Sequence, residues 1–190
     1  MKRKESRLCD IIALKAGANI TRMAPGIPRS MIYTSQDIED DLDQAGCGCA
    51  AQASASGMEP GSLRAGDVVV SLATGRAAVV TESNAGKVLR NTEAICRILG
   101  GAADPWYLCY FFNESRNLKE AMARGLVGPQ RFLTISELLK LDVQLPALRT
   151  QEAMGRIYRD LCRLDHLHER RRFLVRRLVL GAMAEGNGGN

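Results

Sequence analysis

Hydrophobic and polar positions through the middle of the chain follow short runs that are typical of β-strands. Val68–Leu72 is a β-branched run of strand length, and a Thr-Gly turn separates it from Ala77–Val80, the expected return strand of a hairpin. The glycine pair Gly100–Gly101 is expected to end the sheet. Further extended segments are predicted at four short apolar stretches, which are Ser30–Tyr33, Val88–Leu89, Ala94–Leu99 and Val143–Pro146.

Three segments carry helix signals. Asp104 is a good N-cap with proline after it, and the pattern predicts a helix from there to Gly125. Thr134–Glu137 is a capping box that opens a short helix. Thr150 is expected to cap a long helix that continues to about Met183. At 1.5 Å per residue this last helix spans roughly 50 Å, which is longer than the preceding domain requires.

The long helix carries a stripe of residues with alternating three- and four-residue spacing. Seven of its nine positions are apolar, and the two polar ones, His168 and Arg171, lie in the middle. One interpretation is a helix that packs on its own domain at both ends. The other interpretation is pairing with another helix as a coiled coil. We favour it because the helix is longer than its own domain requires. The apolar positions assigned to dimerisation are Met154, Ile157, Leu161, Leu164, Val175 and Leu178.

These patterns predict an α+β chain in three parts. Residues 1–147 form one mixed globular domain, residues 148–184 form the long helix, and residues 185–190 form a polar, glycine-rich tail that we expect to be disordered. Residues 43–62 are rich in Gly, Ala and Ser without a hydrophobic period and are predicted to form a surface loop.

Composition narrows the class of protein. The 190 residues are 46% hydrophobic and 25% charged, the balance of a globular protein that needs no disulfides, and the net charge of +5 fits an anionic partner without requiring one. Of the six cysteines only Cys47 and Cys49 lie close together, and a zinc site usually needs a second pair. With no signal peptide and no apolar run of about 20 residues, a cytoplasmic protein without membrane contact is expected.

The sequence lacks patterns typical of catalysis. The two histidines, His166 and His168, point to different sides of the long helix, and no phosphate-binding loop or dinucleotide motif is present. The acidic run Glu39–Asp41 with Asp43 could be mistaken for a metal site, but no further metal-ligating residues accompany it. A solvated turn is therefore predicted there. We therefore predict no enzyme, no metal and no cofactor on this chain.

Six segments in order along the chain resemble the target-recognition domains of type I restriction-modification specificity subunits. They are Leu8–Ile12, Tyr33–Ile38, Leu63–Ser71, Asp104–Phe112, Thr134–Leu138 and Val143–Pro146, with Gln151 beginning the long helix. A full specificity subunit resembles two such domains joined by two long spacer helices packed antiparallel, whereas this chain has one of each. The resemblance therefore implies self-association through the long helix, giving a homodimer that reads two identical half-sites.

The same resemblance implies sequence-specific binding of double-stranded DNA without catalysis by this chain. A separate methyltransferase subunit that uses S-adenosylmethionine would modify adenine, and a separate restriction subunit would cut the DNA in host defence. Basic and amide residues in loops are expected to contact the DNA, although each is at least as well explained as a solvated surface residue. They are Arg22, Arg76, Lys87, Arg90, Arg124, Gln130 and Arg131.

Two other functions stay open at this point. An orphan DNA-binding protein would share the fold but have no methyltransferase partner. A protein-interaction module would use the same basic loops to contact a protein, and the modest charge of +5 keeps that alternative open. An enzyme is the least supported alternative.

Overall fold

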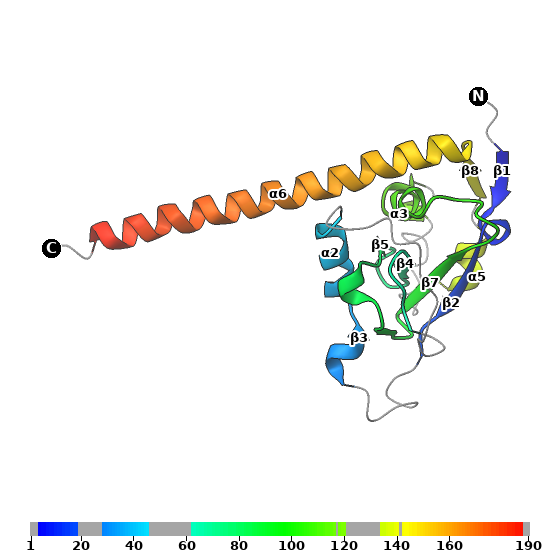
Figure 1. Cartoon of the computed structure of the whole chain (residues 1–190), viewed down its shortest axis with the longest axis horizontal. Helices are drawn as coiled ribbons and strands as arrows, with labels where there is room; N and C mark the ends of the chain where they lie inside the picture. Colours follow the sequence, from blue (N-terminus) through cyan, green and yellow to red (C-terminus); the bar gives the residue numbers. More distant parts are fainter. Residues whose placement is uncertain are drawn as a thin grey trace.

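The computed structural model of the protein describes residues 4–18, 28–45, 62–116, 118–120, 134–140 and 142–187. Its strands are β1 (Lys4–Arg7), β2 (Ile12–Ala16), β3 (Ile32–Tyr33), β4 (Val68–Ser71), β5 (Ala77–Val79), β6 (Val88–Leu89), β7 (Glu93–Ile98) and β8 (Asp142–Leu145). Its α-helices are α2 (Ser35–Asp43), α3 (Pro105–Glu114), α5 (Ile135–Leu139) and α6 (Leu148–Asn187). Short 3-10 helices are η1 (Leu8–Asp10), η2 (Arg29–Met31) and η3 (Glu82–Asn84). The predicted α+β class is confirmed (Figure 1).

A four-stranded antiparallel sheet with the strand order β2-β7-β4-β5 lies at the centre of the domain. The predicted hairpin of β4 and β5 is confirmed, with Val68 opposite Val79 and Gly75 at a φ of +70° in the turn. Glycine suits that turn because a side chain would be strained in the left-handed region. All residues of β4 are buried, so this strand is the centre of the hydrophobic core.

Two small sheets complete the domain. Strand β1 pairs antiparallel with β8, which ties the start of the domain to the segment before α6, and β3 pairs parallel with β6. The predicted strand at Ser30–Tyr33 is only partly right. Its first residues form the 3-10 helix η2, since Met31 N–H donates to the carbonyl of Pro28 at 2.9 Å, and only Ile32–Tyr33 is extended.

Helix α3 covers the edge of the central sheet. Its predicted N-cap is confirmed, because Asp104 accepts the N–H of Tyr107 at 2.8 Å. Asn113 then binds both backbone groups of Ala77: its side-chain oxygen accepts the N–H at 2.8 Å and its side-chain nitrogen donates to the carbonyl at 2.9 Å. Strand β5 is an edge strand, and this amide occupies groups that would otherwise be free to pair with another chain.

The predicted end of α3 at Gly125 is wrong. Ser115 has a ψ of 123°, which is extended, so the helix ends at Glu114. Leu118, which lies beyond this end, is nevertheless buried in the core.

The first half of α6 packs on α3 and α2 (Figure 1). Gln151 is only 2% exposed, and its side chain accepts the N–H of Asp104 at 3.1 Å while donating to the carbonyl of Pro146 at 2.9 Å. Gly155 lies one turn later, where the two helices approach each other closely. Tyr158 continues the contact, with its ring 5.6 Å from the ring of Tyr110.

The observed bounds of α6 differ from the predicted ones. Thr150 is not its cap, because the carbonyl of Ala147 already accepts the N–H of Gln151 and the helix begins at Leu148. The helix continues to Asn187, so residues 185–187 of the predicted disordered tail are helical. The second half of α6 extends away from the domain (Figure 1). In the part of the chain that the structure describes, no helix is both long and apolar enough to cross a membrane.

Replacing Gly155 by alanine should disturb the docking of α6. A Cβ there would lie 2.2 Å from Asp104 Oδ1 and 2.9 Å from the backbone nitrogen of Tyr107, so the helices must move apart. We expect G155A to lower the free energy of unfolding by about 1 to 3 kcal/mol in urea titrations.

Gly181 provides the matched control, because a Cβ there meets nothing within 4 Å. The change G181A should leave stability unchanged or raise it by up to about 1 kcal/mol, as expected for an exposed helix. Equal effects of the two changes would show that the α3–α6 contact is not as close as described.

Candidate nucleic-acid interface and helix surface

Helix α2 is an acidic element that organises the surface around the predicted DNA-contacting residues. Thr34 caps it through a capping box with Asp37, in which Thr34 N–H donates to Asp37 Oδ2 at 2.7 Å. Ile38 and Leu42 face the core. The predicted solvated turn at Glu39–Asp41 is therefore wrong, because these residues lie within a helix.

Asp41 is fully buried and holds three segments together. Its Oδ2 accepts the hydroxyl of Tyr33 at 2.6 Å, and its Oδ1 accepts the hydroxyl of Thr81 at 2.6 Å and the amide of Asn84 at 2.8 Å. Burial, together with the neighbouring carboxylate, raises the pKa of Tyr33 far above its ordinary value, so its phenol stays protonated and donates. This carboxylate has a structural role, because its hydrogen-bonding capacity is taken up within the domain.

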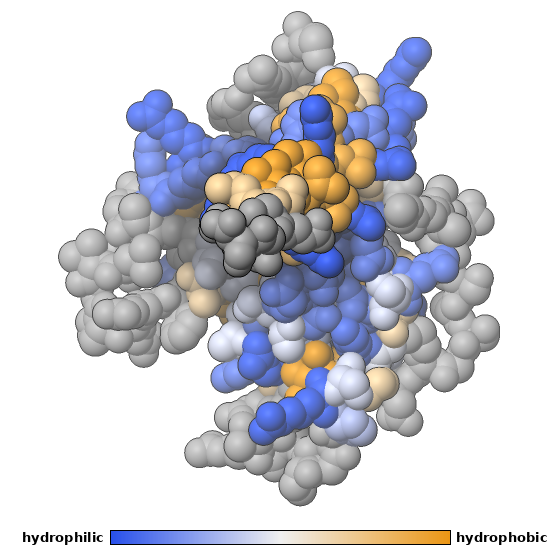
Figure 2. Space-filling model, turned by 90° about the vertical axis from the view of Figure 1, so that its left-hand side faces the viewer, coloured by the Kyte–Doolittle hydropathy of each residue, from blue (hydrophilic) through white to orange (hydrophobic). Residues whose placement is uncertain are grey.

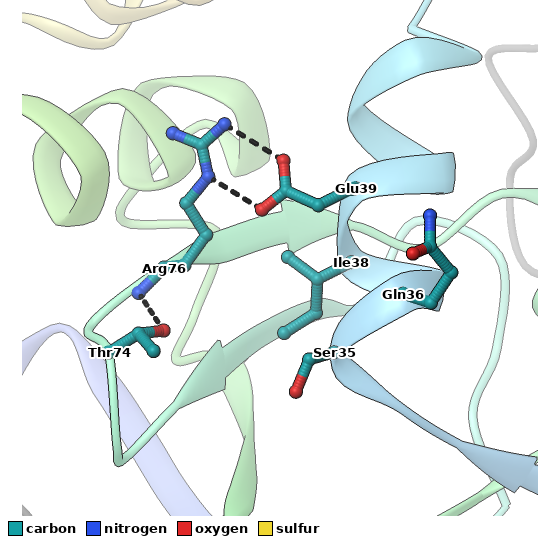
Figure 3. A pocket seen from close by; sticks show the side chains of 6 residues that line it. All are labelled: Ser35, Gln36, Ile38, Glu39, Thr74 and Arg76. Atoms are coloured by element: carbon teal, nitrogen blue, oxygen red, sulfur yellow. Dashed lines mark hydrogen bonds and ion pairs between the residues drawn. The ribbon is translucent and has the colours of Figure 1, made fainter.

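Arg76 forms a two-pronged ion pair with Glu39 (Figure 3). Its Nε and Nη2 donate to the two carboxylate oxygens at 3.1 and 3.0 Å, and the hydrogen bond to Glu39 raises the pKa of the arginine. The pair lines a hollow of about 360 Å³ together with Ser35, Gln36, Ile38 and Thr74 (Figure 3). Only part of the guanidinium is left to contact another acceptor.

Lys87 is paired with Asp37 at 2.6 Å, and both side chains are mostly buried. Burial alone would raise the pKa of Asp37, but the hydrogen bonds from Lys87 and Thr34 outweigh it and hold the pKa below its ordinary value. The lysine therefore fastens η3 and β6 to the start of α2.

Arg90 faces Glu93 across a tight turn, with 3.8 Å between Nε and Oε2. Glu93 is 1% exposed, and its other oxygen accepts the hydroxyl of Thr92 at 2.9 Å. Burial raises the pKa of Glu93. The side chain of Arg90 is 43% exposed, although its Nε is buried.

The structure thus gives each described candidate a carboxylate partner that the sequence did not reveal. Arg76 and Lys87 lie on two sides of α2, and Arg90 belongs to a separate turn. The remaining candidates lie outside the described residues, as does the cysteine pair considered for zinc; these are Arg22, Arg124, Gln130, Arg131, Cys47 and Cys49. Among the described residues no group of three or more His, Cys, Asp or Glu could hold a metal ion.

A second surface lies along α6. The apolar stripe residues Ile157 and Leu178 are 69% and 76% exposed, and Leu161, Leu164 and Val175 are about half exposed. Met154 is partly buried. Figure 2, which views the free end of this helix, shows apolar side chains gathered there beside hydrophilic ones. The hydrophilic side chains of this half include five arginines, which are Arg170, Arg171, Arg172, Arg176 and Arg177.

The two histidines of α6 have different surroundings. His166 Nδ1 lies 3.0 Å from Asp43 Oδ2, a contact that joins α6 to the end of α2. His168 is exposed. This agrees with the expectation that the two point to different sides of the helix.

Comparison with known proteins gives a likeness of fold. No family model matches the sequence, and no curated protein matches it either. Among solved structures, the HsdS subunit from Thermoanaerobacter tengcongensis superposes with a TM-score of 0.55 at 16% identity, covering 88% of this chain and 39% of that one. A chain from a structure of the type I R-M system, concerned with its complex assembly and conformational transition, gives 0.53 at 16% identity, covering 95% and 43%.

The chain has the fold of part of an HsdS subunit. The resemblance found in the sequence is confirmed at the level of the fold. The chain spans less than half the length of either structure. The division at residue 147 and the pairing of the helix stay predictions.

The ion pair of Asp37 should make stability depend on pH. Because its pKa is lowered in the folded protein, Asp37 contributes fully above its ordinary pKa of 3.8, and this contribution is lost as the pH falls below that value. D37N should cost about 1 to 2 kcal/mol at neutral pH in urea unfolding, and the difference from the unchanged protein should shrink below about pH 3.8.

Asp40 serves as the control for this experiment. It accepts a hydrogen bond from Gln36 on the exposed side of the same helix. D40N should change stability by less than about 0.5 kcal/mol at either pH. A cost of D37N that is the same at neutral and acidic pH would contradict the assigned ion pair.

Proposed function

We propose that this chain recognises a specific sequence of double-stranded DNA as the specificity subunit of a type I restriction-modification complex. The observation that carries this proposal is the likeness of fold to HsdS over 88% of the chain. The six ordered sequence segments that resemble target-recognition domains support it independently of the structure.

In this proposal the chain positions DNA and other subunits act on it. A methyltransferase subunit that carries S-adenosylmethionine modifies adenine after flipping it from the duplex, and a restriction subunit cuts. The chain itself supplies no catalytic group and binds no cofactor. We also propose that two copies pair through α6, because this helix exposes an apolar stripe.

For DNA contact we retain the predicted loop residues, of which Arg90 is the best supported among those described. Its side chain is 43% exposed while its Nε lies 3.8 Å from a buried carboxylate, and a partly exposed guanidinium suits a phosphate or guanine acceptor. Arg76 and Lys87 form closer ion pairs with carboxylates of α2, and each would have to contact the DNA while it keeps its carboxylate partner.

The protein-interaction alternative has one observation in its favour. Each described cation that was expected to contact DNA already has a carboxylate partner, which reduces the positive potential that a phosphate backbone would meet. A DNA-binding experiment therefore decides between the two functions.

Selection of random DNA duplexes by the purified protein tests the proposal. Enrichment of one motif, with log affinity falling linearly against log salt concentration, is the expected result. Recovery of random sequences at every salt concentration would exclude a specificity subunit and favour the protein-interaction module.

Arg90 should matter for that binding. We expect R90A to weaken binding to the selected motif by about tenfold, because one arginine contact to a base or phosphate is worth roughly 1 to 3 kcal/mol. Fluorescence anisotropy with a labelled duplex measures the change.

Arg116, whose side chain is 90% exposed and which pairs with Glu120 on the surface, provides the control. R116A should bind the motif with unchanged affinity. An unaltered affinity of R90A would remove Arg90 from the interface without affecting the fold assignment.

A further inference from the structure

Five arginines of α6 recur at a constant interval of seven residues. All five are exposed, and together we call them the arginine row, which consists of Arg149, Arg156, Arg163, Arg170 and Arg177. Seven residues are slightly less than two helical turns, so each arginine lies within about 20° of the one before it on the helix surface. At 1.5 Å per residue the row is about 42 Å long.

The arginine row lies between the two other surfaces of α6. Arg163 follows Cys162, which packs against the core of the domain, and precedes Leu164 of the apolar stripe. Because consecutive residues of a helix are about 100° apart, Arg163 faces neither the domain nor the stripe. The row therefore stays accessible to a further partner, whether or not a second helix covers the stripe.

Carboxylates accompany the first half of the arginine row. Side chains three or four residues apart are neighbours on a helix, and Glu152 lies at these distances between the first two arginines of the row. Asp160 lies in the same way between Arg156 and Arg163. However, Oδ1 of Asp160 is 3.6 Å from Nε of Arg159, which does not belong to the row. The charge of Arg163 is therefore only weakly opposed.

The second half of the arginine row has no carboxylate at these distances. The residues three or four positions from Arg170 and Arg177 are a histidine, a glycine and four apolar residues, which are His166, Leu167, Phe173, Leu174, Leu180 and Gly181. Within the described residues neither arginine takes part in an ion pair. This half of α6 also extends away from the domain, so its positive charge is open to an external anion (Figure 1).

The charge of the row complements the backbone of a DNA duplex. The described loop candidates Arg76, Lys87 and Arg90 each face a carboxylate of the domain, whereas Arg170 and Arg177 face none. Contact between a cation and a phosphate releases a condensed counterion, which favours binding where the cation is unpaired. A duplex presents phosphates along its whole length, so successive arginines about 10.5 Å apart can each contact one.

We propose that Arg163, Arg170 and Arg177 of the arginine row bind phosphates of a DNA duplex without reading its sequence. The proposal rests on the proposed function for the choice of DNA as the anion, but the site lies outside the loops assigned to base recognition. Helix α6 then supplies affinity that is independent of sequence, and the loops of the domain supply discrimination between sequences.

Binding of the full-length protein to a labelled duplex of random sequence tests the row. We expect the triple change R163Q/R170Q/R177Q to weaken this binding at least about tenfold at about 0.1 M salt, as measured by fluorescence anisotropy. The slope of log affinity against log salt concentration should fall by about 2 to 3, because three phosphate contacts are lost. Glutamine is a good helix former, and circular dichroism checks that α6 remains helical.

Two matched variants separate phosphate contact from other effects. R29Q/R97Q/R116Q removes the same net charge from exposed arginines of the globular domain, and it should change affinity for the random duplex by less than about threefold. R163K/R170K/R177K should keep most of the affinity, because a phosphate also accepts lysine as a point charge.

Three results would overturn the proposal. Unchanged binding by the glutamine variant of the row would show that solvent or an acidic protein, rather than DNA, meets these arginines. Equal weakening by the control variant of the domain would show an effect of net charge alone. Equal losses with lysine and with glutamine in the row would show that the arginines do not act through their charge.

Selection of a DNA motif is measured separately, so that the two proposals can fail independently. The glutamine variant of the row should enrich the same motif as the unchanged protein, because phosphate contacts carry no sequence information directly. Enrichment of a different motif would contradict a role limited to the backbone. If neither protein enriches any motif, the proposed function fails, and the comparison on the random duplex still decides whether the row binds DNA.

Discussion

The close contact between the first half of α6 and α3 determines the shape of this protein. Gln151 bridges the beginnings of the two helices, and the absence of a side chain at Gly155 lets α6 pass directly over Asp104 and Tyr107. This contact fixes the direction in which α6 leaves the domain (Figure 1). It also turns one side of the helix inward, so that the apolar stripe faces outward where a second helix can reach it.

Helix α2 exerts a second constraint, through charge. Its carboxylates form ion pairs with Arg76 and Lys87 and contact His166, and Asp41 accepts a hydrogen bond from Thr81. The acidic helix therefore contacts the β4–β5 hairpin, the turn before β6 and α6. The consequence for function is that positive charge near α2 is largely neutralised inside the domain. Within the described residues, the arginines from Arg170 to Arg177 on α6 take part in no ion pair, and they form a dense basic cluster there.

The sequence predicted those structural elements that are determined by residues close together in the chain. The β4–β5 hairpin, the Asp104 cap and the Thr134 capping box each depend on a few neighbouring residues, and all are observed. The ends of α3 and α6 were misplaced, because the backbone is extended at Ser115 and α6 begins at Leu148, before the expected cap at Thr150, and continues to Asn187. Helix α2 carried recognisable signals, with a threonine cap and apolar residues four apart, but its acidic run suggested a solvated turn.

The partners of the candidate site residues could not be predicted in the same way. Arg76 and Glu39 are 37 residues apart and Lys87 and Asp37 are 50 apart, so only the folded chain brings them together. Glu93 is near Arg90 in sequence, but its burial follows from the central sheet rather than from its neighbours. The apolar stripe on α6 could be located from the sequence because its spacing is a property of the helix itself, and its role in pairing stays a prediction.

The central claim is that this chain directs DNA modification to a particular sequence. The most direct test is a genome-wide map of methylated adenine in the native host, compared with a strain from which the gene has been deleted. The account predicts that methylation disappears at one motif, composed of two identical, inverted half-sites at a fixed spacing, and returns when the gene is restored. An unchanged methylation map, in cells shown to contain the folded protein, would contradict it.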